Sequence, residues 1–155
     1  MPNLPVLVIG GGPAGLEASR GIADLGYNCI LVDKADFLGG NPIFADYSAI
    51  TPDMRNAEEA MDEMIAKVMV NPLVDVRLNT TVTASKGEAP NLSVTLKNGK
   101  DDETVDVGSI VVATGFQHFD PGKETQMYGY YEFDDVITLV DAERMLKAGN
   151  FVRPS

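Results

Sequence analysis

The distribution of apolar residues along the chain predicts a layered structure built around buried strands. Residues 6–9, 28–32 and 110–113 are apolar throughout or nearly so, as expected for central parallel strands that are covered by helices on each side. Residues 74–78 alternate between apolar and polar types, which indicates a further strand nearer to the sheet edge. We therefore expect a parallel sheet. If its strands follow the spatial order third, second, first, fourth, the strand at residues 110–113 is left with a free edge, which invites pairing with another chain.

Helical spacing of apolar residues predicts the covering elements. Ala14, Ala18, Ile22 and Leu25 mark one helix, and Gly26 follows where a helix end favours a left-handed residue. A second helix is expected over residues 55–70, and a short third helix is expected over residues 140–147. The buried stripe of the second helix is predicted to comprise Ala57, Met61, Met64, Ile65, Val68 and Met69. Core packing is the favoured role of those methionines.

Residues 81–107 follow a different pattern. Three short segments alternate with period two, and Asn98 and Gly99 punctuate them, which predicts a small antiparallel meander. The fold class is therefore α/β: a parallel sheet with an inserted antiparallel β-meander at residues 81–107. Residues 1–155 are expected to form a single domain.

A glycine motif joins the first strand to the first helix. Gly10, Gly12 and Gly15 satisfy G-x-G-x-x-G in the strand–turn–helix context that gives this motif its meaning. The three glycines permit the tight turn, the approach of a pyrophosphate and close packing of the helix on the strand. Pro13 and Ala14 begin the helix, whose first N–H groups and dipole favour an anion. We predict a dinucleotide phosphate at this turn.

The second strand ends in Asp33, 18 positions after Gly15. Dinucleotide-binding folds place at about this spacing an acidic residue that accepts hydrogen bonds from ribose hydroxyls. A carboxylate accepts a free 2′-OH and repels a 2′-phosphate, so we favour the ribose role over that of a solvated strand end.

Composition limits the partners. Twelve basic and 23 acidic residues give a net charge of −11, which argues against nucleic acid and requires that any phosphate be held by local backbone N–H groups. The single cysteine, Cys29, excludes an iron–sulfur cluster ligated by this chain's cysteines alone. No metal site is predicted. Apolar runs are too short to span a membrane, and a cytoplasmic location is expected.

Asp33 and Lys34, followed by Gly39 and Gly40, resemble the FAD-binding Rossmann domains of the two-dinucleotide-domain flavoproteins. That family usually carries Glu at the strand end, whereas this chain has the shorter Asp. The resemblance implies that residues 1–155 form a single FAD-binding (dinucleotide-binding) domain with a Rossmann-like parallel sheet of the FAD/NAD(P)-binding type. It therefore implies FAD as the cofactor. It also implies that Asn41, just after the glycine pair, lies near the flavin or its ribityl chain.

The same resemblance assigns two further cofactor contacts. Val82 matches the position whose backbone usually meets the adenine, and Ala113, Thr114 and Gly115 match a second glycine turn beside the cofactor. A nicotinamide-binding Rossmann domain is not expected to carry the meander or this second turn.

The tail is most similar to the flavin subunit of heterodisulfide reductase and to the related flavin subunits of the quinone-interacting membrane-bound oxidoreductase. The segments that carry this likeness are Thr114–Gly115–Phe116, Phe119–Asp120–Pro121, Tyr128–Gly129–Tyr130, Val136–Ile137–Thr138 and residues 143–146. It implies electron transfer between flavin and iron–sulfur partner proteins. Family members also continue beyond the point where this chain stops, so we expect an N-terminal fragment of a longer flavoprotein, or a subunit completed by a partner.

No acid–base pair or nucleophile stands out, so no catalytic residue is assigned. His118, the sole histidine, is expected to be a solvated loop residue, with a flavin contact as the less favoured alternative. Two other functions remain open at this point: a cofactor-free scaffold with a Rossmann fold, and an NAD-binding domain.

Overall fold

The computed structural model describes residues 4–123 and 128–155 and divides the chain into two compact units. The first unit comprises the residues up to Gly40 together with Met61–Gly115, and the second comprises Asn41–Ala60 and Phe116–Ser155. The single-domain assignment for residues 1–155 stays a prediction.

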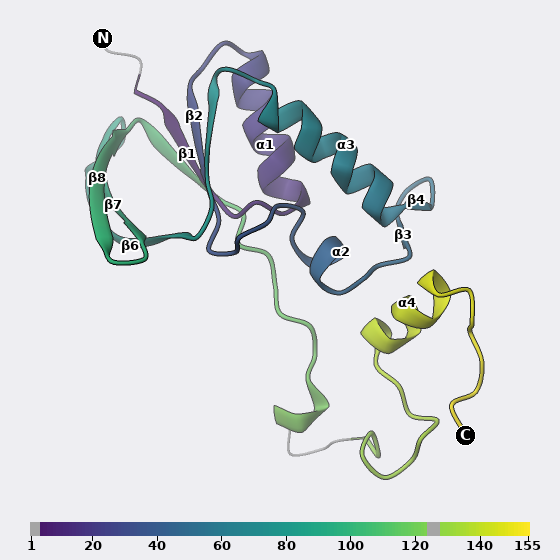
Figure 1. Cartoon of the computed structure of the whole chain (residues 1–155). Helices are drawn as coiled ribbons and strands as arrows, with labels where there is room; N and C mark the ends of the chain where they lie inside the picture. The colour runs from purple at the N-terminus through teal and green to yellow at the C-terminus, as the bar shows by residue number, and fades with distance from the viewer. Residues whose placement is uncertain (1–3, 124–127) are drawn as a thin grey trace. The chain divides into compact units, whose positions relative to one another are not determined.

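The first unit is built on a four-stranded parallel sheet (Figure 1). Its strands are β1 (Val6–Ile9), β2 (Cys29–Val32), β5 (Val74–Arg77) and β9 (Ser109–Val112), in the spatial order β5-β2-β1-β9. This is the order third, second, first, fourth that was considered for the sheet, and it leaves β9 at one edge. Because β1 pairs with both β2 and β9, the glycine turn that follows it leaves from the middle of the sheet.

Helices cover one face of the sheet. In Figure 1, α1 (Pro13–Asp24) and α3 (Ala57–Met69) lie on the same side of the strands. Their apolar stripes pack on alternate strand residues, and the buried cluster contains Val8, Leu16, Leu31 and Val68. Met61 is fully buried, as the predicted stripe requires, whereas Met69 is exposed and does not belong to it.

The other face is covered by the meander, which corrects the expectation of helices on both sides. Its strands are β6 (Thr80–Glu88), β7 (Asn91–Asn98) and β8 (Asp101–Val107), paired antiparallel in that order. A second buried cluster joins Leu7, Ile30 and Val32 of the sheet to Val94, Leu96 and Val107 of the meander. The central strands are therefore apolar on both faces because two different layers bury them.

The fourth strand of the sheet is less buried than its sequence predicted. Val112 at the end of β9 is 71% exposed, and among the residues that the structure describes β9 pairs with β1 alone. The expected free edge is therefore found at β9.

The second unit contains short elements held by polar contacts. They are α2 (Asn41–Phe44), the β3 (Ala49–Ile50) and β4 (Arg55–Asn56) hairpin, the 3-10 turn Pro121–Lys123, and α4 (Leu139–Lys147). The β4 strand occupies residues that were predicted as the start of the long helix, which begins at Ala57 instead.

Helix α4 is fastened at both ends. Thr138 and Asp141 form a reciprocal capping box at its start. The Glu143 carboxylate accepts hydrogen bonds from the Ser48 amide (3.0 Å) and hydroxyl (2.7 Å), and Lys147 pairs with Asp46. These contacts join two segments that lie far apart in the sequence.

Because α1 packs closely on the sheet, we expect a side chain at Gly15 to destabilise the protein. A Cβ at Gly15 would lie 1.7 Å from the Gly10 carbonyl oxygen, whereas a Cβ at Gly21 of the same helix would meet nothing within 4 Å. Gly15→Ala should therefore lower the free energy of unfolding by about 3 kcal/mol. Gly21→Ala should raise it by up to about 1 kcal/mol. Urea unfolding of both variants checks this, and equal effects would contradict the packing described.

Candidate dinucleotide-binding site

The glycine turn after β1 is shaped by two close backbone contacts. Gly10 has a positive φ of 110°, and a Cβ there would lie 2.3 Å from the Ala113 carbonyl oxygen. Gly15 packs in turn against the Gly10 carbonyl. The polypeptide itself therefore requires glycine at both positions, for the tight turn and for the close approach of helix to strand.

Gly12 differs from its neighbours in this respect. Its φ of −76° suits any residue, and a Cβ there would meet only the Gly40 Cα, at an ordinary 3.7 Å. The fold thus leaves open space beside Gly12. An external group that must approach the backbone closely gives a reason for glycine at this position.

The start of α1 presents unpaired donors next to that space. Gly12 is the N-cap residue, and no side chain caps the helix within the described part of the chain. Pro13 carries no N–H, and Leu16 makes the first internal bond, to the Gly12 carbonyl (2.9 Å). The N–H groups of Ala14 and Gly15 are therefore available to an anion at the positive end of the helix dipole. The donor set fits a phosphate group.

Asp33 lies at the carboxyl end of β2, beside the same turn. Its Oδ2 accepts a hydrogen bond from the Gly11 amide (2.5 Å), and its Oδ1 accepts one from the Ala35 amide (2.8 Å). Each carboxylate oxygen keeps a further lone pair. The carboxylate is thus held in one orientation against the glycine loop and can still accept hydroxyl groups.

Gly11 is a residue that sequence reasoning missed. Besides donating to Asp33, it accepts a hydrogen bond at its carbonyl from the Gly39 amide (2.8 Å). A Cβ at Gly11 would lie 2.4 Å from a Leu38 methyl carbon and 3.1 Å from Asp33 Oδ2. The signal for it was the run of three consecutive glycines, of which the motif accounts for only two.

The predicted glycine pair also reaches the turn. Gly40 has a positive φ of 61°, and a Cβ there would lie 2.8 Å from the Gly12 Cα. Together with the bond from Gly39 to Gly11, this contact lays the segment after β2 directly on the glycine loop. This approach requires glycine at position 40, whereas a Cβ at Gly12 would make only an ordinary contact with Gly40.

The second glycine turn meets the first from the other side. The Ala113 amide donates to the Ile9 carbonyl (2.8 Å), and its own carbonyl lies against Gly10. Thr114 and Gly115 follow in exposed positions, with Gly115 at a positive φ of 69°. The structure therefore gathers the glycine loop, Asp33, the Gly39–Gly40 pair and the Ala113 turn at one end of the sheet.

Three of the predicted contact residues have their side chains engaged elsewhere or exposed. The Lys34 side chain is exposed. Val82 pairs with Leu96 and packs on the apolar cluster between sheet and meander. Asn41 belongs to the second unit, where its amide donates to the Phe116 carbonyl (2.9 Å). Roles for these three residues in binding stay predictions.

His118 has partners in the second unit, unlike a freely solvated histidine. Its Nε2 lies 3.0 Å from the Tyr47 hydroxyl, and its ring packs edge-to-face with Phe116 and Tyr47. Cys29, by contrast, is the core residue that was expected: it is 1% exposed, and burial raises the pKa of its thiol.

Two candidate features are not found in the described residues. No group of His, Cys, Asp and Glu there is placed to hold a metal ion. None of the described helices has the length and apolar character needed to cross a membrane.

Comparison with known proteins agrees with this geometry. Residues 4–149 match the pyridine nucleotide-disulphide oxidoreductase family. The chain belongs to this family. The resemblance to FAD/NAD-binding Rossmann domains of flavoproteins, drawn from the sequence, is thereby confirmed.

Two relatives match across most of the chain. It is 23% identical to an iron-sulfur subunit of the CoB–CoM heterodisulfide reductase of Methanopyrus kandleri, across 97% of this chain and 34% of the relative. It is also 23% identical to one subunit of the ferredoxin:CoB-CoM heterodisulfide reductase of Methanosarcina acetivorans, across 90% of this chain and 28% of the relative. The chain thus spans about a third of the length of these relatives.

Solved flavoproteins and related enzymes share the fold. L-proline dehydrogenase from P. horikoshii superposes with a TM-score of 0.65 at 20% identity, covering 77% of this chain and 25% of the enzyme. Thioredoxin reductase from Streptococcus pyogenes gives 0.52 at 18% identity, covering 73% and 31%. At these identities the likeness establishes the Rossmann-like α/β fold.

The contacts of Asp33 predict a structural effect of removing it. Asp33→Ala leaves the Gly11 and Ala35 amides without their acceptor, so the free energy of unfolding should fall by roughly 1–3 kcal/mol. Asp36→Ala, at an exposed aspartate three positions later, should change it by less than about 0.5 kcal/mol. Chemical denaturation of both variants is the measurement. Equal stability of the two would mean that Asp33 does not hold the loop.

Proposed function

We propose that the chain is the FAD-binding part of an electron-transferring flavoprotein oxidoreductase, similar to the flavin subunit of heterodisulfide reductase. Family membership makes it a dinucleotide-binding oxidoreductase module. The proposal adds two points to family membership: the cofactor is FAD, and the flavin transfers electrons. Contacts at the glycine loop support FAD as the cofactor.

The observation that carries the proposal is the packing of Gly39 and Gly40 on the glycine loop. The Gly39 amide binds the Gly11 carbonyl at 2.8 Å, and Gly40 sits against Gly12. A simple nucleotide-binding turn needs the first glycine motif alone. The added pair extends the loop with a second stretch of backbone free of side chains, as in the FAD-binding domains that this chain resembles.

Asp33 supports a dinucleotide without a 2′-phosphate. Its carboxylate is held by two amides beside the phosphate turn and retains acceptor capacity on both oxygens. A carboxylate at this position can accept a hydrogen bond from the 2′-OH of the adenosine ribose, and its negative charge repels a 2′-phosphate. FAD and NAD both meet this condition, whereas NADP does not.

The residues of the first unit would hold the ADP half of the cofactor. The Ala14 and Gly15 amides would bind the pyrophosphate, Gly12 would admit it, and Asp33 would orient the ribose. When bound, FAD supplies the electron-pair or hydride chemistry. The likeness to relatives whose names include ferredoxin and iron-sulfur supports the proposal that the flavin exchanges electrons with iron–sulfur proteins.

Visible absorbance and titration with FAD and NADH distinguish an FAD-binding module from an NAD-binding domain and from a cofactor-free scaffold. Purified protein should either carry the visible flavin band or gain it at one equivalent when FAD is added and free ligand is removed. A colourless protein that ignores FAD and binds NADH would replace the proposal with an NAD-binding domain. A protein indifferent to both would make the chain a cofactor-free scaffold.

Gly12→Ala tests the phosphate cradle independently of folding. The new methyl group meets only the Gly40 Cα at 3.7 Å, so the free energy of unfolding should change by less than about 0.5 kcal/mol. The methyl fills the space that a phosphate needs, so FAD affinity measured by calorimetry should fall about tenfold or more. Gly21→Ala, on the same helix, is the matched control and should bind FAD normally. Unchanged affinity in Gly12→Ala would contradict binding at this turn.

A further inference from the structure

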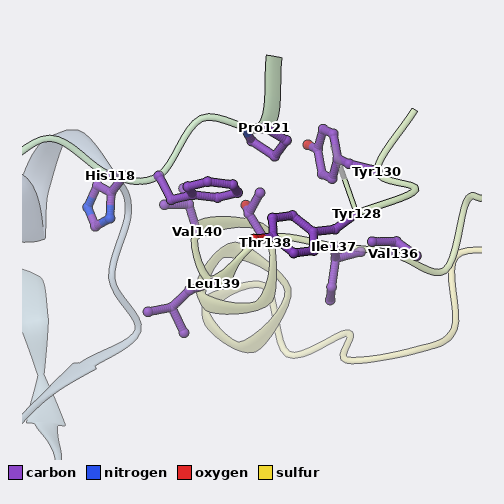
Figure 2. Close-up of a pocket in the computed structure, with 10 residues that line it drawn as sticks. His118, Pro121, Tyr128, Tyr130, Val136, Ile137, Thr138, Leu139 and Val140 are labelled. Atoms are coloured by element: carbon purple, nitrogen blue, oxygen red, sulfur yellow. The ribbon is translucent and has the colours of Figure 1, made fainter. Parts of the chain in front are cut away.

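The second unit contains a pocket whose lining residues are not among those assigned to the dinucleotide site. Its volume is about 350 Å³, and it lies between the segment that follows Phe116 and the start of α4. Figure 2 shows Pro121 and Tyr130 on one side of it, with Tyr128 drawn close to Ile137 and Thr138 on the other. A pocket of this size accommodates a small organic molecule.

Aromatic rings form much of the wall. Phe119 and Tyr128 pack edge-to-face with ring centroids 6.0 Å apart and planes inclined by 65°, and Tyr130 lines the same pocket. Tyr128 is 71% exposed and has a positive φ of 52°, a conformation that costs energy for a bulky residue. The Tyr128 backbone is therefore strained, and the Tyr128 ring is exposed at the pocket.

The hydroxyl groups of Tyr130 and Thr138 in the lining are already engaged with one carboxylate. Asp141 Oδ2 accepts hydrogen bonds from the Tyr130 hydroxyl (3.0 Å) and from the Thr138 hydroxyl (2.7 Å). Burial raises the pKa of Asp141, but the bonds from Thr138 and Tyr130 lower it by more, so the pKa lies below its usual value. Asp141 is therefore ionised at neutral pH, bonded directly to two lining residues.

This arrangement also affects the Tyr130 ring. Its hydroxyl donates to an anion, which raises the pKa of the phenol and directs electron density toward the ring. The face of an aromatic ring carries partial negative charge and attracts cations. Arg144, three residues along α4, lowers the pKa of both groups through its charge and is not among the residues that line the pocket.

Charge selects among possible ligands. The second unit has eleven Asp and Glu residues and five Lys and Arg residues, so its field repels anions. Among the described residues, the lining contains no lysine or arginine, and the hydroxyl groups of Tyr130 and Thr138 already donate to Asp141. A strongly polar neutral molecule would lose hydrogen bonds to water without replacing them.

We propose that this aromatic pocket binds a small organic cation, with an alkylated ammonium group placed against the rings of Phe119, Tyr128 and Tyr130. Such a group needs no hydrogen-bond donor from the protein. It gains from apolar contact, from the ring faces and from the nearby Asp141 carboxylate.

Two probes of nearly equal shape test the charge requirement. Choline carries the quaternary ammonium, and 3,3-dimethyl-1-butanol is its neutral isostere. Titration of the full chain, followed by NMR or calorimetry, should give saturable choline binding at least about fivefold tighter than binding of the isostere. Equal affinities would overturn the cation assignment, and absence of saturable choline binding would overturn the proposal as a whole.

Variants locate the binding. Tyr128→Leu keeps an apolar side chain but removes a ring, and it should weaken choline binding about fivefold. Phe44→Leu removes an equally exposed ring of the same unit that does not line the pocket, and it should bind choline as the parent chain does. Equal losses in both variants, or none in Tyr128→Leu, would contradict binding at this pocket. Circular dichroism confirms that both remain folded.

Discussion

The contact between the start of α1 and the first glycine turn is the constraint on which the rest of the first unit depends. The Gly10 carbonyl lies where a Cβ of Gly15 would stand, and the Ala113 carbonyl lies where a Cβ of Gly10 would stand. The helix can approach the sheet so closely only because these side chains are missing. This approach brings the helix N-terminus to the end of β1, beside Asp33 and the Gly39–Gly40 pair. The location that we propose for the dinucleotide, at this end of the sheet, is a consequence of the packing.

A strongly acidic chain can hold a phosphate in this way because the interaction is local. The net charge of −11 opposes an anion at long range, but that effect is screened over about a Debye length of 8–10 Å at physiological salt. Backbone N–H groups at the helix end act at hydrogen-bond distance. Asp33 adds a negative charge beside them, and its two amide bonds hold that charge in a position suited to a ribose hydroxyl. In the function that we propose, the backbone N–H groups would therefore bind the pyrophosphate of the ADP group, and Asp33 would bind its ribose.

Much of the fold could be predicted from the local pattern of apolar residues. The wrong predictions concern contacts between separate segments, which local periodicity does not encode. Apolar runs in β1 and β2 and the helical spacing in α1 identify elements because each carries its own periodicity. Periodicity did not predict that the meander covers one face of the sheet. A residue such as Leu7 is apolar whether a helix or the meander buries it. Likewise, β4 was assigned to a helix because its pairing with β3 involves only two residues on each side. At the site, the steric roles of Gly10 and Gly15 followed from the motif. The link from Gly11 to Asp33 required knowledge of the folded backbone.

The most direct test of the phosphate site is to map which backbone amides respond when FAD binds. In a proton–nitrogen NMR titration of the full chain with FAD, the amide resonances of Gly12, Ala14 and Gly15 should shift the most, with those of Gly11 and Asp33 following. Saturation should occur at one equivalent. Binding of FAD that left these amide resonances unmoved while shifting others would contradict the central claim that the glycine turn after β1 is the phosphate site.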